Sequence, residues 1–126
     1  MKTVEVIARR WWNDTGIDVA AGETLGFAAS GAWIDLNYSS DAGGYDPPRW
    51  MHLFEGIRRH PRGRWFELTG CIGRRRFGGF SIGNRAQVRM PAAGRLYLYA
   101  NDVPGFYRNN RDALRVTVTR IAGTAS

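Results

Sequence analysis

Hydrophobic and polar residues alternate with a period of two near the end of the chain. Every second residue from Leu114 to Val118 is apolar, and Arg95–Ala100 alternates in the same way. Such alternation places successive side chains on opposite faces of a β-strand, one face buried and the other wet. We therefore predict two strands here, joined by a turn-rich loop from Asp102 to Asp112.

Similar short segments recur along the chain, separated by many of its 16 glycines. This punctuation is typical of an all-β sandwich or barrel, and no strand–helix–strand alternation suggests a parallel sheet. A length of 126 residues suits one domain, residues 1–126. Further predicted strands are Thr3–Ala8, Thr24–Ser30, Trp65–Ile72 and Ala86–Met90.

One long segment, Tyr38–Arg64, has no clean periodicity and contains three of the five prolines. Irregular connections of this length are usually functional. We expect a large loop here, with a short helical turn near Trp50–Glu55. Aromatic residues fill small sandwiches as often as they stack on sugars. Trp33 and Trp65 are expected in the core, and the stacking candidates are Trp11, Trp12 and Trp50.

The net charge is +7, and arginine supplies every positive side-chain charge except that of Lys2. Seven arginines fall between Arg58 and Arg76. Arginine pairs bidentately with carboxylate and phosphate. The cluster therefore indicates either an acidic polysaccharide or nucleic acid as partner, or a solvated face. Its Arg74–Phe77 part is most simply a charged hairpin turn, so nucleic acid is not the expected partner.

Several classes are excluded by what the sequence lacks. Its single cysteine, Cys71, allows no intrachain disulfide and lies in an apolar segment, as a buried structural cysteine would. No apolar run is long enough to span a membrane, and the start lacks the apolar core of a signal peptide. We expect a cytoplasmic protein, or one exported without a recognisable signal. No phosphate-cradling glycine loop and no constellation of paired carboxylates is present, so we expect a protein that is not an enzyme.

The loop Asn101–Asn110, with the sequence NDVPGFYRNN, contains a cluster of oxygen donors. Calcium takes six to eight oxygen ligands, and the loop offers the Asp102 carboxylate and the amide oxygens of Asn109 and Asn110. A Pro-Gly turn can fold the loop back on itself. The absence of a His/Cys cluster argues against zinc, and the spacing is not that of an EF-hand. An ordinary connection rich in turn residues is the alternative.

This segment resembles the signature of the calcium-dependent, galactose-binding bacterial lectins of the LecA type. In that family, Asn-Asp-Val-Pro-Gly is followed by a variable residue, Tyr, another residue and Asn-Asn. Weaker resemblances are Ala28–Trp33, Ile72-Gly73 and Ile82-Gly83. The resemblance implies a galactose-binding-like β-sandwich of jelly-roll type, with one calcium ion at its edge, that forms a homo-oligomer.

The resemblance also implies the residues of the site. The side chains of Asp102, Asn109 and Asn110 would bind calcium, together with the backbone carbonyls of Phe106 and Asp35. Two adjacent sugar hydroxyls would displace water from the ion. The residues around these hydroxyls would be Asp102, Val103 through its backbone, Phe106 and Asn109.

A histidine and a glutamine three residues apart bind the primary hydroxyl of the sugar in that family. His52 and Glu55 have this spacing here, with glutamate replacing glutamine, and His60 is the rival histidine. Arg108 and Arg111 flank the asparagines, where they would weaken calcium binding, or instead recruit an acidic sugar or a phosphate. Two other functions remain open: a polyanion-binding module that uses the arginine cluster, and a structural domain that has lost its sugar site.

Overall fold

The computed structural model describes residues 1–47, 49–74, 79–103 and 106–121, and it gives only the backbone of residues 53, 55 and 56. Its regular elements are strands and two 3₁₀ helices. In chain order they are β1 (Lys2–Ile7), β2 (Asn13–Val19), β3 (Thr24–Ser30), β4 (Trp33–Asp35), β5 (Tyr38–Ser40), η1 (Arg49–Ile57), β6 (Leu68–Ile72), β7 (Phe80–Ser81), β8 (Arg85–Arg89), β9 (Gly94–Ala100), η2 (Tyr107–Asn109), β10 (Asn110–Arg111) and β11 (Ala113–Arg120).

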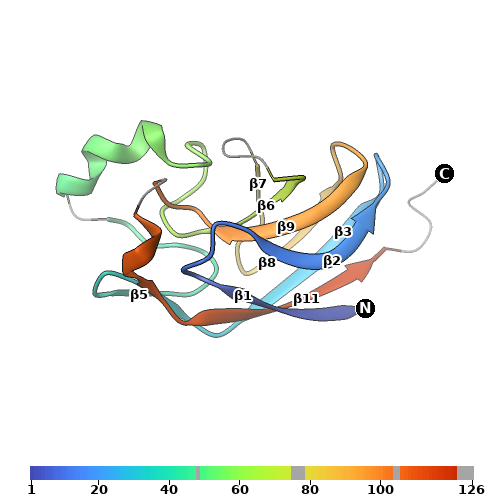
Figure 1. The fold of residues 1–126 in the computed structure, drawn as a ribbon, viewed down its shortest axis with the longest axis horizontal. Helices are drawn as coiled ribbons and strands as arrows, with labels where there is room; N and C mark the ends of the chain where they lie inside the picture. The colour runs from blue at the N-terminus through green and yellow to red at the C-terminus, as the bar shows by residue number, and fades with distance from the viewer. Residues whose placement is uncertain (48, 75–78, 104–105, 122–126) are drawn as a thin grey trace.

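Two four-stranded sheets form the body of the molecule (Figure 1). The first has the order β1-β11-β3-β8 and the second β2-β9-β6-β7, and the strand pairs are antiparallel. One continuous cluster of apolar side chains, drawn from both sheets, fills the space between them. The prediction of an all-β sandwich is therefore confirmed.

The core follows from the alternation in the sequence. On β11, Leu114, Val116 and Val118 are buried, and on β9 Leu96 and Leu98 are buried. Removing a side chain of this size from water contributes about 1.5–3 kcal/mol. Trp33 and Trp65 are buried as predicted, and so is Cys71.

The predicted strand Trp65–Ile72 begins three residues later than expected, at Leu68. Phe66 has a φ of 61°, which an extended strand cannot contain. Trp65 forms only an isolated bridge, with Tyr45. The residues before Leu68 therefore turn the chain toward the edge of the sandwich instead of extending the sheet.

The strand β2 gave no signal in the sequence because polar residues occupy two of its three buried positions. The Asn13 side chain bonds to the backbone of Ile7 and to the Leu98 carbonyl, at 2.8–3.1 Å. The Thr15 hydroxyl donates to the Leu96 carbonyl at 2.8 Å. These bonds satisfy the buried polar groups, so the strand needs no apolar alternation.

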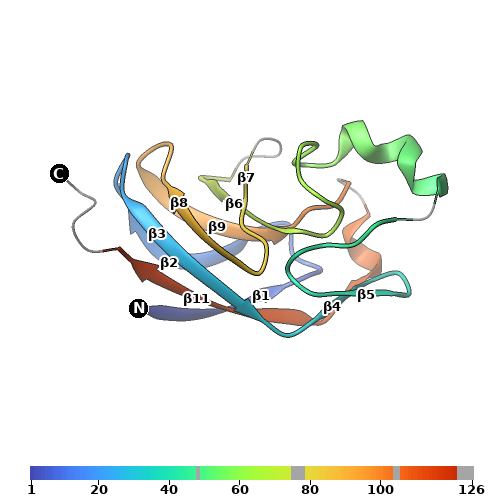
Figure 2. The ribbon, with the colours of Figure 1, turned by 180° about the vertical axis from the view of Figure 1, so that it is seen from behind.

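The remaining elements gather at one end of the sandwich (Figures 1 and 2). They are a three-stranded sheet of order β10-β4-β5, the helix η2 and the helix η1. The helix η1 confirms the helical turn predicted within the long loop. None of the helices that the structure describes is long and apolar enough to cross a membrane.

Candidate metal centre

The cation loop, residues Asn101–Asn110, connects β9 to β10 at this end of the sandwich. Its first residue is firmly held. The Asn101 side chain accepts a bond from the His60 amide at 2.9 Å and donates to the carbonyls of His60 and Arg64, at 2.8 and 2.9 Å. The segment 58–64 therefore fixes where the loop begins.

The register of β4 and β10 places Asp35 directly opposite Asn110. Residues opposite each other in an antiparallel pair project from the same face of the sheet, so these two side chains are neighbours. Asp35 is only 2% exposed, and its Oδ2 accepts a 2.5 Å hydrogen bond from the Tyr45 hydroxyl. The family resemblance implied a role for Asp35 only through its backbone carbonyl, but its carboxylate is also buried here.

Asp102 is 1% exposed and lies close enough to Asp35 to be affected by its charge. Burial, and secondly repulsion from Asp35, raise the pKa of Asp102 to about 7. The Val103 amide, which donates to Oδ1 at 2.7 Å, and the nearby Asn110 amide oppose this rise. Burial likewise raises the pKa of Asp35, against the bond from Tyr45. The carboxylates of Asp35 and Asp102 thus lie near each other in a buried, poorly solvated environment.

Three oxygens of the loop are buried without a hydrogen-bond partner among the described residues. They are Oδ2 of Asp102, Oδ1 of Asn109 and Oδ1 of Asn110. A buried acceptor left unpaired costs roughly 1–3 kcal/mol, and more when it is charged. The amide nitrogen of Asn110 donates to the Ala8 carbonyl at 3.1 Å, which holds the side chain in place.

This donor set fits a hard divalent cation. Oxygens from carboxylates and amides are what calcium prefers, and two carboxylates would balance its charge. The described residues contain no cluster of three or more His, Cys, Asp or Glu, so amide oxygens would have to complete such a site. Calcium therefore suits the side chains of Asp35, Asp102, Asn109 and Asn110.

Two of the three backbone positions predicted at the site, Val103 and Phe106, lie on the cation loop. The Val103 amide donates to Asp102, and its carbonyl accepts from the Phe106 amide at 3.0 Å. The Phe106 ring packs edge-on against Phe54 of η1, with centroids 5.3 Å apart. A small apolar cluster around Met51 and Val103 continues this contact. Through it, η1 packs directly onto the cation loop.

The predicted sugar contact His52 is an exposed residue of η1. The side chain of its predicted partner Glu55 lies outside the described part of the structure. The rival, His60, directs its Nε2 to the Ser81 hydroxyl at 3.0 Å, and burial lowers its pKa. Trp50, also on η1, is 50% exposed. The contact between η1 and the loop thus places His52 on an element that borders the site.

Two further residues at this end of the molecule, Tyr45 and Arg59, could not be found from the sequence. Tyr45 lies in an irregular segment, where no pattern predicts its bond to Asp35. Arg59 stands in a run of arginines and is nevertheless fully buried. Its guanidinium lies over the rings of Trp11 and Trp12, which the sequence offered as sugar-stacking residues.

The arginine cluster between residues 58 and 76 is not one solvated face. Both Arg58 and Arg59 are buried, and Arg58 donates to the carbonyls of Pro61 and Gly63. Arg64 pairs with Asp46 at 3.4 Å. Residues 75–78, which include most of the predicted charged turn, lie outside the described residues. The sequence could not separate these arginines because charge alone does not show which side chains find partners inside the fold.

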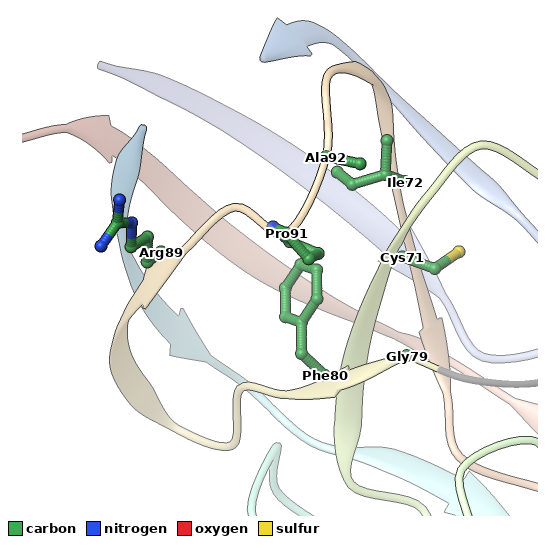
Figure 3. A pocket seen from close by; sticks show the side chains of 7 residues that line it. All are labelled: Cys71, Ile72, Gly79, Phe80, Arg89, Pro91 and Ala92. Carbon is green, nitrogen blue, oxygen red and sulfur yellow. The ribbon is translucent and has the colours of Figure 1, made fainter. Parts of the chain in front are cut away.

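A pocket of about 380 Å³ lies elsewhere, between β6, β7 and the connection from β8 to β9. In Figure 3 the Phe80 ring points toward Pro91 across this pocket, and the guanidinium of Arg89 points away from it. None of the residues that the sequence singled out as metal or sugar ligands lines it. The pocket is therefore separate from the candidate metal centre.

No protein-family model and no curated protein sequence matches the chain. Among solved structures, the chain is similar to one described as the EclA N-terminal domain, a PllA-like lectin. The TM-score is 0.71 at 22% sequence identity, over 96% of this chain and 97% of that chain. The match shows that the two chains share a fold over nearly their whole length.

Proposed function

We propose that the protein is a calcium-dependent lectin, a carbohydrate-binding protein without enzymatic activity. The observation that carries this proposal is the set of three buried oxygens, from Asp102, Asn109 and Asn110, that have no hydrogen-bond partner among the described residues. The carboxylate of Asp35 lies close enough to Asp102 to affect its charge. The similarity in fold to a PllA-like lectin supports the proposal independently. So does the loop sequence, which resembles the calcium-binding signature of the LecA-type lectins.

The cation would be held by side chains of the cation loop and of β4. Asp102, Asn109 and Asn110 would contribute the oxygens that lack hydrogen-bond partners among the described residues. Phe106 would contribute its backbone carbonyl, as the family resemblance implies. Asp35 would contribute a second negative charge, through its backbone carbonyl, its carboxylate or both. Charge count is a main determinant of calcium affinity, so this carboxylate should strengthen binding.

A bound calcium ion supplies coordination positions that two neighbouring hydroxyls of a saccharide can fill in place of water. Around those hydroxyls, the Asp102 carboxylate would accept hydrogen bonds, and the Asn109 amide would donate or accept them. The Val103 backbone would close one side of the site. His52 and Glu55 would reach a more distant hydroxyl. Galactose or a related glycoside is the expected ligand.

A glycan array probed in calcium, and again in chelator, tests the proposal. We expect binding to galactosides in calcium, and loss of binding in chelator. Asp102→Asn should abolish glycan binding in calcium as well. Asp46→Asn is the control, because Asp46 is exposed and its only described contact is with Arg64. Binding that persists in chelator would refute the role of calcium. An array without any bound glycan would instead favour a domain that has lost its sugar site.

The second candidate function is binding of acidic polysaccharides. Arg108 and Arg111 are exposed on either side of the asparagines that would hold the cation. Salt separates the two functions, because polyanion binding weakens steeply as salt rises, whereas coordination of neutral hydroxyls does not.

We also propose that the protein forms a homo-oligomer. A single sugar site binds weakly, and several sites in one oligomer bind a multivalent glycan more strongly.

A further inference from the structure

Arg59 is fully buried near the start of segment 58–64, and its backbone is bonded to the cation loop. Four aromatic rings surround its guanidinium. The Tyr99 ring centroid is nearest, at 3.5 Å, and those of Trp12, Trp11 and Tyr107 lie at 5.4–5.6 Å. The guanidinium also donates to the Trp11 carbonyl. Cation–π contacts away from water contribute roughly 2 kcal/mol or more, which helps to offset the cost of burying the charge.

The same residue is bonded near both ends of the cation loop. Its backbone amide donates to the carbonyl of Asp102 at 3.1 Å. Its guanidinium donates to the Tyr107 hydroxyl at 3.0 Å, in the turn that precedes Asn109. That hydroxyl in turn donates to the carbonyl of Ala100 at 2.5 Å, just before the loop. Arg59 and Tyr107 thus connect the last residue of β9, the backbone of Asp102 and the helix η2.

These bonds matter because the loop bears oxygens that repel one another. A flexible loop could turn the Asp102 carboxylate and the Asn109 amide toward water and would then have to be ordered again on binding. Ordering costs affinity, so a loop already fixed in its binding conformation binds more tightly. Lysine cannot replace Arg59 here, because it lacks the planar fork that stacks on rings and donates in two directions.

We propose that Arg59 is a positioning residue that, with Tyr107, holds the cation loop in its binding conformation before the cation arrives. This inference rests on the proposed function. It predicts that Arg59 raises the calcium affinity of the site, in addition to stabilising the fold.

The test compares Tyr107→Phe and Arg59→Lys with Tyr99→Phe. Tyr99 also faces Arg59, but its buried hydroxyl has no hydrogen-bond partner among the described residues, so its loss is a matched control. Calcium affinity is measured by calorimetry at 15 °C on variants that are fully folded in circular dichroism. We expect calcium to bind about tenfold more weakly to Tyr107→Phe. Arg59→Lys should lose at least as much, and Tyr99→Phe should stay within about twofold.

A second readout needs no calcium. In chelator, the amide of Phe106 donates to Val103 and that of Asn110 donates to Tyr107, so both should be protected from hydrogen exchange. We expect both amides to exchange faster in Tyr107→Phe and to be unchanged in Tyr99→Phe. A role in general stability would lower the unfolding temperature and leave calcium affinity at 15 °C unchanged.

The outcomes separate the two proposals. If the wild-type protein binds calcium and Tyr107→Phe binds it equally well, the inference on Arg59 is wrong and the proposed function stands. If the wild-type protein binds no calcium, the proposed function fails, and the exchange of these two amides decides whether Arg59 orders the loop. Unchanged exchange in Tyr107→Phe would overturn the inference in that case. If Arg59→Lys does not fold, Tyr107→Phe alone decides.

Discussion

The hydroxyl of Tyr45 donates a 2.5 Å hydrogen bond to Oδ2 of Asp35. It is the only hydrogen bond to this carboxylate from a side chain in the described residues, and the carboxylate is buried beside that of Asp102. The bond favours the ionised form of Asp35, which is the form a cation needs. Tyr45 therefore belongs to the site although it need not touch the ion.

Tyr45→Phe should weaken calcium binding about tenfold, because hydrogen bonds to charged groups contribute roughly 1.5–3 kcal/mol. Tyr38→Phe is the matched control, since Tyr38 stacks on Tyr45 and is partly exposed. Calorimetric titration of both variants with calcium measures the effect. Equal affinities would show that Asp35 needs no help from Tyr45.

Asp102→Asn should lower calcium affinity by about a hundredfold or more, because it removes one of two acidic ligands. In chelator at pH 8 the same variant should melt at a higher temperature than the wild type, since it removes the repulsion between two buried carboxylates. Calorimetric titration measures the first effect and thermal unfolding the second. A variant that melts lower in chelator would contradict the idea that these charges destabilise each other.

The stability of the cation-free protein should fall as pH rises from about 4 to about 7. The pKa of Asp102 is about 7 in the folded chain, above the ordinary value of 3.8. Between these values the folded state binds a proton that the unfolded state does not, so raising the pH favours unfolding. The full effect is on the order of 4 kcal/mol. Thermal unfolding in chelator across this range measures it, and Asp102→Asn should flatten the dependence.

His52→Ala should weaken galactoside binding about fivefold and leave calcium affinity unchanged, because the side chain is exposed and would contact only the sugar. His60→Ala is the comparison, as the His60 side chain bonds to Ser81 while its backbone holds Asn101. Sugar titration in saturating calcium distinguishes them. A loss confined to His60→Ala would move the contact to the rival histidine.

The sandwich was predictable where burial alone decides the pattern. The alternation from Leu114 to Val118 gave β11, because these side chains have no role but to leave water. The strand β2 could not be predicted, since Asn13 and Thr15 occupy buried positions through hydrogen bonds to distant backbone. A period-two pattern reports apolar burial and is silent where polar side chains are satisfied within the fold.

The sequence by itself determined the all-β fold and a loop rich in oxygen donors, because alternation and local turn chemistry are properties of short segments. Only the tertiary structure decided that Asp35 lies opposite Asn110 and beside Asp102. It also decided that the Arg59 guanidinium is buried among aromatic rings. These contacts join residues far apart in the chain. Strand register and the desolvation of charge set them, and both arise only when the whole sandwich is packed.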